Sequence, residues 1–509
     1  QLLDYLKATD VYLFTSKDPN QAVSGTFSYA MSCSCPIVAS KIPHTMESLT
    51  TDVGILVDIQ NVEQFASATI KLLADDALRT QMAINAYAKT TKTSWENTAI
   101  KHVEVYQRIS KELNHIKISH PTIKMDHLRK MTTDIGIIQF CKISDPDLES
   151  GYTIDDNARA LIAICKYYQL AGKQSDIEYM KIYLNFIERC QMTDGSFINY
   201  VDKYNVIEAR NSNENLEDSN GRAIWALGYF LGLPLSSEQA PLINQAIYCL
   251  KKGVKNAEKF NSPRDIAFSI KGLYYWNSVQ PSLPIRNSIK VLSTKIQAMY
   301  TFVSTPEWNW FENKLTYANS ILPEALLMTY LITGEEKTKE IAVQSMNFLT
   351  DKMFVDGQFK IISNDGWHQK GVIPNSFGEQ PIEACYMMHT LDLFYKTFGN
   401  TEYKVYLKKA FDWFLGRNHL SHIMYNPITG GCYDGLEENN VNLNQGAEST
   451  VCYLSARLLI ESYTSSGKNS ALINNSNTNK YKFSRSKLLE NSTISSRVIT
   501  SKMQNKAQF

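Results

Sequence analysis

Hydrophobic residues follow one pattern in residues 1–113 and another in residues 126–464. In the first part, short apolar runs at 11–15, 36–40 and 53–58 alternate with segments of helical periodicity. Such alternation predicts a parallel sheet covered by helices. Because a sheet that stands alone usually has more strands than these three runs supply, we expect the beginning of the sheet to be missing.

The second part is almost entirely helical in its pattern, with amphipathic segments separated by Gly, Pro, Asp and Asn. Six of these segments open with an acid, an amide or Pro followed by Ala and large apolar residues, and they begin at Asp155, Glu217, Pro263, Leu322, Glu379 and Asn444. Further helices are predicted at 175–190, 241–259, 285–303, 335–352 and 401–417. Since one helical hairpin cannot bury its apolar face alone, a series of hairpins predicts a closed ring with inner and outer helices, an (α/α)6 toroid.

Two segments interrupt this order. In residues 114–125 the periodicity lapses and a Pro appears, which indicates a linker between the two parts. Residues 465–509 are rich in Ser, Asn and Lys, with eight Lys or Arg against one Glu and few large apolar residues. This composition predicts a disordered, solvated tail, and an electrostatic docking segment is the alternative.

The composition is that of a globular protein, and a length of 509 residues suggests roughly two to four domains. A net charge of +1 gives no long-range reason to expect nucleic acid or an anionic membrane as a partner. The nine Cys are scattered mostly in apolar helical runs, which favours reduced thiols and a cytoplasmic location. No apolar stretch is long enough to span a bilayer, the first residues do not resemble a signal peptide, and a start at Gln rather than Met indicates a fragment.

Acidic residues gather where the predicted inner helices begin. In a toroid these helices run parallel, so we expect their N-termini to converge at one mouth of the ring. Capping of free backbone N–H groups explains one acid per helix, but it does not explain Asp155 beside Asp156 or Glu217 beside Asp218. We therefore predict a functional cleft, with caps and ion pairs as the alternative. The candidate catalytic residues are Asp155, Asp156, Arg159, Glu217, Asp218, Arg222, Asp265, Glu324, Glu379, Glu383 and Glu448.

Paired carboxylates suit the chemistry of a glycosidic bond, because one acid protonates the glycosidic oxygen while another serves as base or nucleophile. The loops that lead to the inner helices add aromatic rings on which sugars could stack: Trp308, Trp310, Trp367 and Tyr433. Packing inside the loops is the alternative for each ring. The His residues lack a paired metal spacing, and the chain has no P-loop and no G-x-S-x-G motif, so we expect neither a metal nor another cofactor.

Residues 24–49 read SGTFSYAMSCSCPIVASKIPHTMESL and are followed by GILVD at 54–58 and LLADDALRTQMAINAYA at 72–88. These segments resemble the donor-binding half of retaining GT-B glycosyltransferases of family 4, also called group 1. The resemblance implies a partial Rossmann-like domain over residues 1–113 that binds a nucleotide sugar. The two motif acids of that family fall on Gln21 and Tyr29, its Gly falls on Ser34, and Glu47 matches a later acidic position. Gln21, Tyr29 and Glu47 are thus the implied donor-binding residues, although neither motif carboxylate is present.

The helical part resembles the C-terminal domain of bacterial proteins in which a group 1 glycosyltransferase precedes an (α/α)6 toroid of the glycosidase/epimerase kind. The segments that carry this resemblance are HLRKMTTDIGIIQFCKISDPDLESGYTIDDNARALI, EDSNGRAIWALG, FGEQPIEA and NQGAEST. They span about residues 126–460. The family assigns no reaction to single residues of the toroid.

The first hypothesis for function is a glycosyltransferase of glycan synthesis, whose toroid binds or trims saccharide. As the resemblance implies, it would transfer a hexose from a nucleotide-diphosphate donor with retention and without a bound metal. The expected partners are a nucleotide-sugar donor and an oligosaccharide or glycoconjugate. A second hypothesis is a toroid glycosidase, phosphorylase or epimerase with a degenerate transferase scaffold, and a third is a saccharide-binding module without catalysis.

Overall fold

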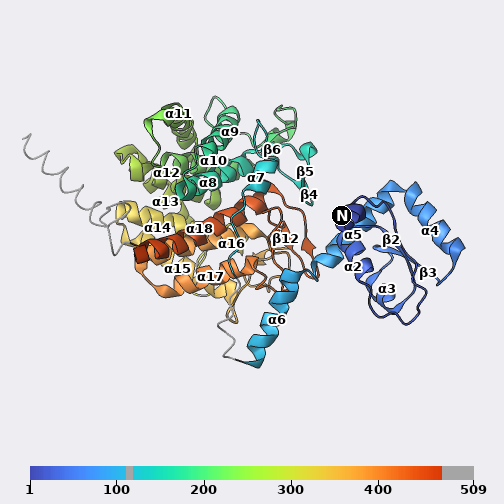
Figure 1. Ribbon diagram of the computed structural model, residues 1–509. Coiled ribbons are helices and arrows are strands. Elements are labelled where there is room, and N and C mark those ends of the chain that lie inside the picture. Colours follow the sequence, from blue (N-terminus) through green and yellow to red (C-terminus); the bar gives the residue numbers. More distant parts are fainter. Residues whose placement is uncertain (111–118, 473–509) are drawn as a thin grey trace, which may run out of the picture. The chain divides into compact units, whose positions relative to one another are not determined.

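The computed structural model describes residues 1–110 and 119–472 (Figure 1). Part of the predicted linker, 114–118, and the predicted tail from residue 473 onward lie outside the described residues. The chain divides into two compact units, Gln1–Leu459 and Ile460–Phe509, and both the sheet and the ring belong to the first. The last described helix continues past the predicted start of the tail at 465, as far as Leu472.

The N-terminal part contains the predicted parallel sheet. Its strands are β1 (Tyr12–Phe14), β2 (Ile37–Ser40) and β3 (Gly54–Val57), hydrogen-bonded in that order with Leu13 opposite Val38 and Val38 opposite Ile55. The helices of this part are α1 (Leu2–Lys7), α2 (Gly25–Ser32), α3 (Pro43–Ser48), α4 (Val62–Ala74), α5 (Asp76–Thr91) and α6 (Trp95–Ile109). All four residues of β2 are buried, which is typical of a strand covered on both faces.

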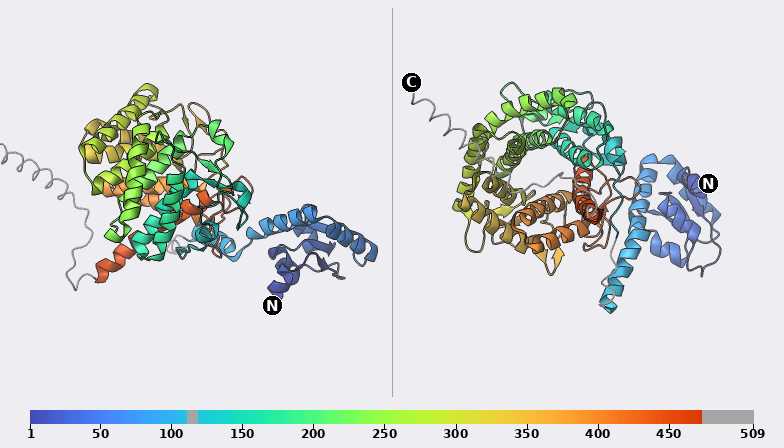
Figure 2. Two further views of the ribbon diagram at one scale, coloured as in Figure 1. Left: turned by 90° about the horizontal axis from the view of Figure 1, so that it is seen from above. Right: turned by 60° about the vertical axis from the view of Figure 1, so that its left-hand side comes forward.

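Residues 126–459 form a ring of helices in two concentric sets. The right-hand view of Figure 2 looks into the centre of this ring. The inner helices are α8 (Ile154–Ala171), α10 (Glu217–Leu231), α12 (Pro263–Val279), α14 (Ile321–Thr333), α16 (Pro381–Phe398) and α18 (Ala447–Leu472). The outer helices are α9 (Ser175–Arg189), α11 (Ala240–Ala257), α13 (Leu283–Val303), α15 (Glu336–Met353) and α17 (Thr401–Phe414), and α7 (Asp126–Met131) precedes them. Each inner helix begins within three residues of its predicted start.

The ring closes where α18 meets both α8 and α16. The Glu448 carboxylate of α18 pairs with Arg159 of α8, and Ser455 of α18 hydrogen-bonds His389 of α16. The remaining inner helices contact one another in chain order, from α8 to α10, α12, α14 and α16. Helices 300 residues apart in sequence therefore lie side by side around one centre.

Glycines bring α10 and α12 into direct backbone contact. A Cβ atom added at Gly228 of α10 would lie 2.0 Å from the carbonyl oxygen of Gly272 in α12, and one added at Gly272 would lie 2.3 Å from that of Ile224. No side chain fits into such gaps, so only glycine allows this approach. The tight contact fixes the relative position of the two N-termini, which carry Arg222 and Asp265.

Short two-stranded sheets shape the loops that lead to the inner helices. The pairs are β4 (Cys141–Lys142) with β5 (Asp145–Pro146), β6 (Tyr152–Thr153) with β7 (Tyr200–Val201), β8 (Lys314–Leu315) with β11 (His368–Gln369), β9 (Phe354–Val355) with β10 (Gln358–Phe359), and β12 (Gly435–Leu436) with β13 (Val441–Asn442). The described residues also contain 3-10 turns at Leu148–Ser150, Ala209–Ser212 and Ser237–Gln239. Pairing of β6 with β7 holds the loop after α9 against the start of α8.

Candidate active site

The N-terminal ends of the inner helices lie together at one mouth of the ring. Polar contacts connect one sector to the next: Arg159 (α8) to Glu448 (α18), Asp155 (α8) to Arg222 (α10), Asp218 (α10) to Tyr317 before α14, Arg264 (α12) to the Tyr317 carbonyl, and Glu383 (α16) to the Ala318 amide. The acidic helix ends are thus neighbours around one opening. Caps that served only their own helices would not be joined in this way.

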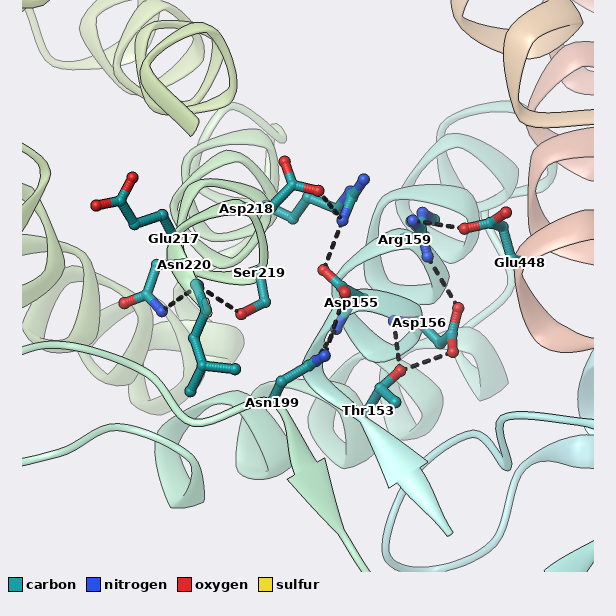
Figure 3. Close-up of polar contacts among 12 residues, drawn as sticks. Thr153, Asp155, Asp156, Arg159, Asn199, Glu217, Asp218, Ser219, Asn220 and Glu448 are labelled. Atoms are coloured by element: carbon teal, nitrogen blue, oxygen red, sulfur yellow. Dashed lines mark hydrogen bonds and ion pairs between the residues drawn. The ribbon is translucent and has the colours of Figure 1, made fainter. Parts of the chain in front are cut away.

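Two arginines each bind two carboxylates in this network (Figure 3). The Arg222 guanidinium lies 2.7 Å from Asp155 and 2.8 Å from Asp218. The Arg159 guanidinium lies 2.9 Å from Asp156 and 2.7 Å from Glu448. Both arginine side chains are at least nine-tenths buried, whereas Asp155, Asp218 and Glu448 are part-exposed. The arginines therefore hold carboxylates at the surface of the mouth.

The first turn of α8 places its two acids by different means. Thr153 is the N-cap: its hydroxyl accepts from the Asp156 amide at 3.1 Å and donates to the Asp156 carboxylate at 2.6 Å. Asp155 is fixed from outside the helix, because the Asn199 side chain accepts from its amide and donates to its carboxylate. Capping chemistry thus accounts for the buried Asp156, and a distant loop orients Asp155.

A cavity of about 430 Å³ opens at this mouth. Its lining includes Asp155, Asp156, Arg159 and Glu448 together with Asp434 and Glu437, from the loop before α18. Sequence reasoning missed the last two residues. The signal that could have found Asp434 is its Gly-rich surroundings in GGCYDGL, since flanking glycines allow a loop to approach a ligand.

The local environment separates the acids of this cavity by pKa. Burial alone would raise the pKa of Asp155, but the charges of Arg222 and Arg159 outweigh it and hold the pKa below its ordinary value. Burial, with the charge of Glu448, raises the pKa of Asp156 to about 6 against the effect of Arg159. Burial raises the pKa of Asp434 to about 7, although the Gly446 amide donates to its carboxylate at 2.8 Å. The surroundings therefore favour the charged form of Asp155 and the protonated form of Asp434.

A second group of acids lies in the sector of α12, α14 and α16. Burial raises the pKa of Glu383 to about 7, and its carboxylate accepts from the backbone of Ala318 and the side chain of Asn319. Burial, followed by the charges of Asp218 and Glu217, raises the pKa of Asp265 to about 8. These groups lie behind the part-exposed carboxylates of the mouth.

Three further candidate acids each bind a group on another helix or loop. Glu217 accepts from the Ser262 amide at 3.3 Å and so ties the start of α12 to α10. Glu379 accepts from the Trp413 indole at 2.6 Å, and burial raises its pKa to about 7. Glu324 lies deeper in the ring, where Lys271 binds it at 2.5 Å.

Of the four aromatic candidates, only Trp367 is part-exposed. Trp308, Trp310 and Tyr433 are 4%, 0% and 4% exposed, and their rings pack inside the loops, so none of the three presents an open face to a sugar. Trp367 has a backbone φ of 57°, which is strained for a bulky residue, and its ring lies 6.2 Å from that of Tyr317. Tyr317 in turn donates to Asp218, which places Trp367 next to the acid network.

The buried Glu383 makes the stability of the folded chain depend on pH. Its folded pKa lies above the ordinary value, so the folded state gains a proton that the unfolded state releases, and stability falls as pH rises from about 4.5 to about 7. We expect Glu383→Gln, which cannot ionise, to flatten this decline by about 1–3 kcal/mol between pH 5 and pH 8. Urea unfolding at both pH values measures the change. The exposed Glu178→Gln serves as the control, and an equal slope in wild type and Glu383→Gln contradicts the prediction.

The residues implied as donor contacts lie in the N-terminal part. Gln21 follows β1 and accepts from Ser16, and Glu47 is an exposed residue of α3, after β2. In a parallel sheet, loops after the strands share one edge, where ligands bind in open α/β folds. Tyr29 lies on the exposed side of α2 and is 53% exposed. Ser34, at the position of the motif Gly, has a φ of 62°, a conformation that favours glycine.

Comparison with known proteins supports the two-part reading of the chain. Residues 1–89 match the family described as "Glycosyl transferases group 1". Over 110 residues the chain is 32% identical to a D-inositol 3-phosphate glycosyltransferase of Corynebacterium urealyticum. That match covers 21% of this chain, and it spans about a quarter, 26%, of the relative. The resemblance of the N-terminal part to group 1 glycosyltransferases is confirmed.

Solved structures of similar fold cover mainly the ring. A cellobiose 2-epimerase from Bacillus thermoamylovorans aligns with a TM-score of 0.53 and 11% identity, over 72% of this chain and 100% of its own. A sugar epimerase from a ruminal bacterium aligns with a TM-score of 0.51 and 11% identity, over 71% and 99%. At this identity the likeness shows the fold alone. The chain thus joins a segment similar to group 1 glycosyltransferases to a toroid whose fold is similar to that of sugar epimerases.

In residues 1–110 and 119–472, no helix is long and apolar enough to cross a membrane. Over the same residues, no group of three His, Cys, Asp or Glu side chains has the geometry of a metal site.

Proposed function

We propose that this chain acts on saccharides in glycan synthesis and that the ring mouth performs acid–base chemistry on a glycosidic bond. Asp434 protonates the oxygen of the glycosidic bond that breaks. Asp155 either bonds to the anomeric carbon as nucleophile, with water later releasing the sugar, or as base takes a proton from the water that attacks that carbon. The observation that supports this assignment is that both carboxyls line one cavity while their surroundings push their pKa values apart. Such a separation allows one carboxyl to give a proton while the other stays charged.

The surrounding residues have supporting parts in this proposal. Arg222 keeps Asp155 ionised, and Asn199 fixes its orientation. Arg159 holds Glu448, which places a further hydrogen-bond acceptor for sugar hydroxyls at the rim, and it also binds the buried Asp156. Trp367 offers the aromatic face on which a sugar ring stacks. The mouth thereby combines a proton donor, a carboxylate and an apolar platform.

For the N-terminal part we propose binding of a nucleotide-sugar donor, with transfer of a hexose to a saccharide or glycoconjugate. The family match supports it, and the proposed donor site lies at the sheet edge after β1 and β2. Gln21 can hydrogen-bond a sugar hydroxyl there but adds no charge. We place the protein in the cytoplasm, because all nine cysteines are free thiols.

A second candidate function keeps the ring chemistry and makes the N-terminal part a scaffold without transfer. The specific observation in its favour is that Gln21 and Tyr29 stand at the two positions where the family has carboxylates. In this reading the ring alone is the enzyme.

Two measurements on the full chain test these proposals separately. Incubation with oligosaccharides labelled at the reducing end, followed by chromatography, is expected to show shortened or rearranged products made by the ring. Calorimetry with UDP and GDP sugars is expected to show donor binding. If no sugar nucleotide binds, the transferase assignment is wrong while the ring assignment stands. If no oligosaccharide is changed, the ring chemistry is wrong.

A further inference from the structure

A second polar cluster lies inside the ring, away from the mouth. It consists of Lys166 on α8, His389 on α16 and Ser455 on α18. The Lys166 ammonium donates to His389 Nε2 at 2.7 Å and to the Ser455 hydroxyl oxygen at 2.8 Å, and Ser455 lies 2.9 Å from the same His389 nitrogen. Three helices that meet only through ring closure thus contribute one side chain each.

Lys166 has no carboxylate within ion-pair distance among the described residues. The other charged groups that influence it are already paired: Lys271 binds Glu324, and Lys396 binds Asp392 at 2.7 Å. The remaining titratable neighbour is the Cys385 thiol. The charge of Lys166 helps to lower the pKa of that thiol, against the effect of burial. An ammonium has three N–H donors, and the short hydrogen bonds to His389 Nε2 and Ser455 use two of them. The third contact, to Nδ1 of the same His389 ring, is long at 3.4 Å, so one N–H can serve a further acceptor. A part-buried cation that no carboxylate pairs is costly to maintain, so an external oxyanion would stabilise it.

Aromatic side chains separate this cluster from the acidic mouth. Trp225, Phe268 and Tyr386 pack against one another with ring centroids 5.4–5.9 Å apart, and each is at most 5% exposed. They lie between the first turns of the inner helices and the level of Lys166. Lys166 and His389 are nevertheless part-exposed. Their exposure therefore comes from the opposite end of the ring.

The side chains around Lys166 on that opposite side are polar and aromatic. Lys166 lies 5.7 Å from the centre of the Tyr229 ring, and the Tyr229 hydroxyl donates to Gln169 at 3.1 Å. Tyr275 packs edge-on against Tyr229 at 4.7 Å. Tyr229 and Tyr275 are part-exposed and Gln169 is exposed. One cation, hydroxyls, an amide and aromatic edges suit a small oxygen-rich anion.

We propose that Lys166, His389 and Ser455 form a binding site for an oxyanion, a phosphate or carboxylate group, that enters the ring from the end opposite the acidic mouth. The ammonium supplies the charge and one free donor. Ser455 and His389 hold it in place, and Ser455 can turn its hydroxyl toward the bound anion. The site is independent of the glycosidic-bond chemistry, because the aromatic cluster lies between the two.

The protonation of Lys166 gives this site a pH dependence. Burial lowers the pKa of Lys166 to about 8, with Lys271 adding to this effect, and burial holds the pKa of His389 well below its ordinary value. A neutral His389 accepts from the ammonium and does not compete for the anion. Binding is therefore expected to weaken as pH rises above about 8, where Lys166 loses its proton.

Calorimetric titration of the full chain tests the site, with inorganic phosphate, glucuronate and glucose as three separate probes at pH 7. We expect phosphate or glucuronate to bind saturably and glucose not to bind at this site. Lys166→Met should weaken the binding of the anion about 10- to 100-fold, which corresponds to the loss of a hydrogen bond to a charged group. Preference for phosphate or for glucuronate then tells which oxyanion the recess takes.

Control variants keep the test decisive. Lys181→Met, on the exposed side of outer helix α9, removes the same charge elsewhere and should leave anion binding unchanged. Ser455→Ala removes the hydroxyl that accepts from the Lys166 ammonium. This variant provides a second measurement of anion binding if circular dichroism shows that Lys166→Met does not fold. Equal anion binding by wild type and by the folded variants overturns the proposal. So does the absence of binding by both anions.

Discussion

Replacing Asp155 by Asn is expected to lower the turnover of oligosaccharide about 10²- to 10⁴-fold, the usual cost of losing a positioned acid or base. The amide keeps the size of the side chain and can still contact Asn199, but it carries no charge to attack or to take a proton. Arg222 retains Asp218 as a partner at 2.8 Å, so the fold should survive the change. Initial rates with labelled oligosaccharide, together with circular dichroism, measure the effect.

Asp434→Asn is expected to cause a loss of similar size and to remove the alkaline limb of the pH profile. The wild-type carboxyl has a pKa of about 7 and gives its proton only in the protonated form, so turnover should fall as pH rises through that value. Asp351→Asn, on the exposed side of outer helix α15, is the matched control and should leave the rate unchanged. Full activity of both Asp155→Asn and Asp434→Asn would rule out the proposed pair of roles.

The second large effect concerns the ion pair inside the ring. Lys271 and Glu324 are 1% and 2% exposed, and their charged atoms lie 2.5 Å apart. Lys271→Met removes the cation and leaves Glu324 buried, with the Thr390 hydroxyl as a hydrogen-bond donor at 3.2 Å. We expect a loss of about 3–5 kcal/mol in the free energy of unfolding, because an unpaired buried charge is costly. Urea denaturation followed by circular dichroism gives the value.

A double variant separates the cost of the unpaired charge from lost packing. Lys271→Met combined with Glu324→Leu replaces both charges by apolar groups and is expected to recover most of the stability. The exposed Lys337→Met controls for loss of a positive charge alone. A destabilisation below about 1 kcal/mol for Lys271→Met would show that the pair contributes little, as surface pairs do.

The helices of the ring could be predicted because their signals are local. Apolar residues at helical spacing and an acid, amide or Pro at each start placed all six inner helices within three residues. The glycine contact between α10 and α12 could not be predicted. In the sequence, Gly228 and Gly272 are only residues of low helix propensity. The packed structure alone shows that their backbones are in contact.

The candidate site could be predicted only in part. Convergence of the acids followed from the ring, but the partners of each acid did not. Arg222 binds Asp155 across 67 positions of sequence, and Asp434 joins the cavity from a loop without secondary-structure signals. Trp308 and Trp310 carry the same apparent sugar-stacking signal as Trp367, yet they are buried in the loops. Composition does not tell an aromatic core residue from an exposed platform.

The sequence by itself determined the three strands of the parallel sheet, the helices of the ring, the order of the sheet part and the ring, and the acids at the helix starts. These features depend on residues close together in the chain, whose periodicity and capping are read directly. Only the tertiary structure decided which acids share an arginine, which carboxyls gain or lose a proton, and which side chains reach a cavity. Those properties depend on burial and on charges brought together by ring closure, and both arise only when distant segments pack.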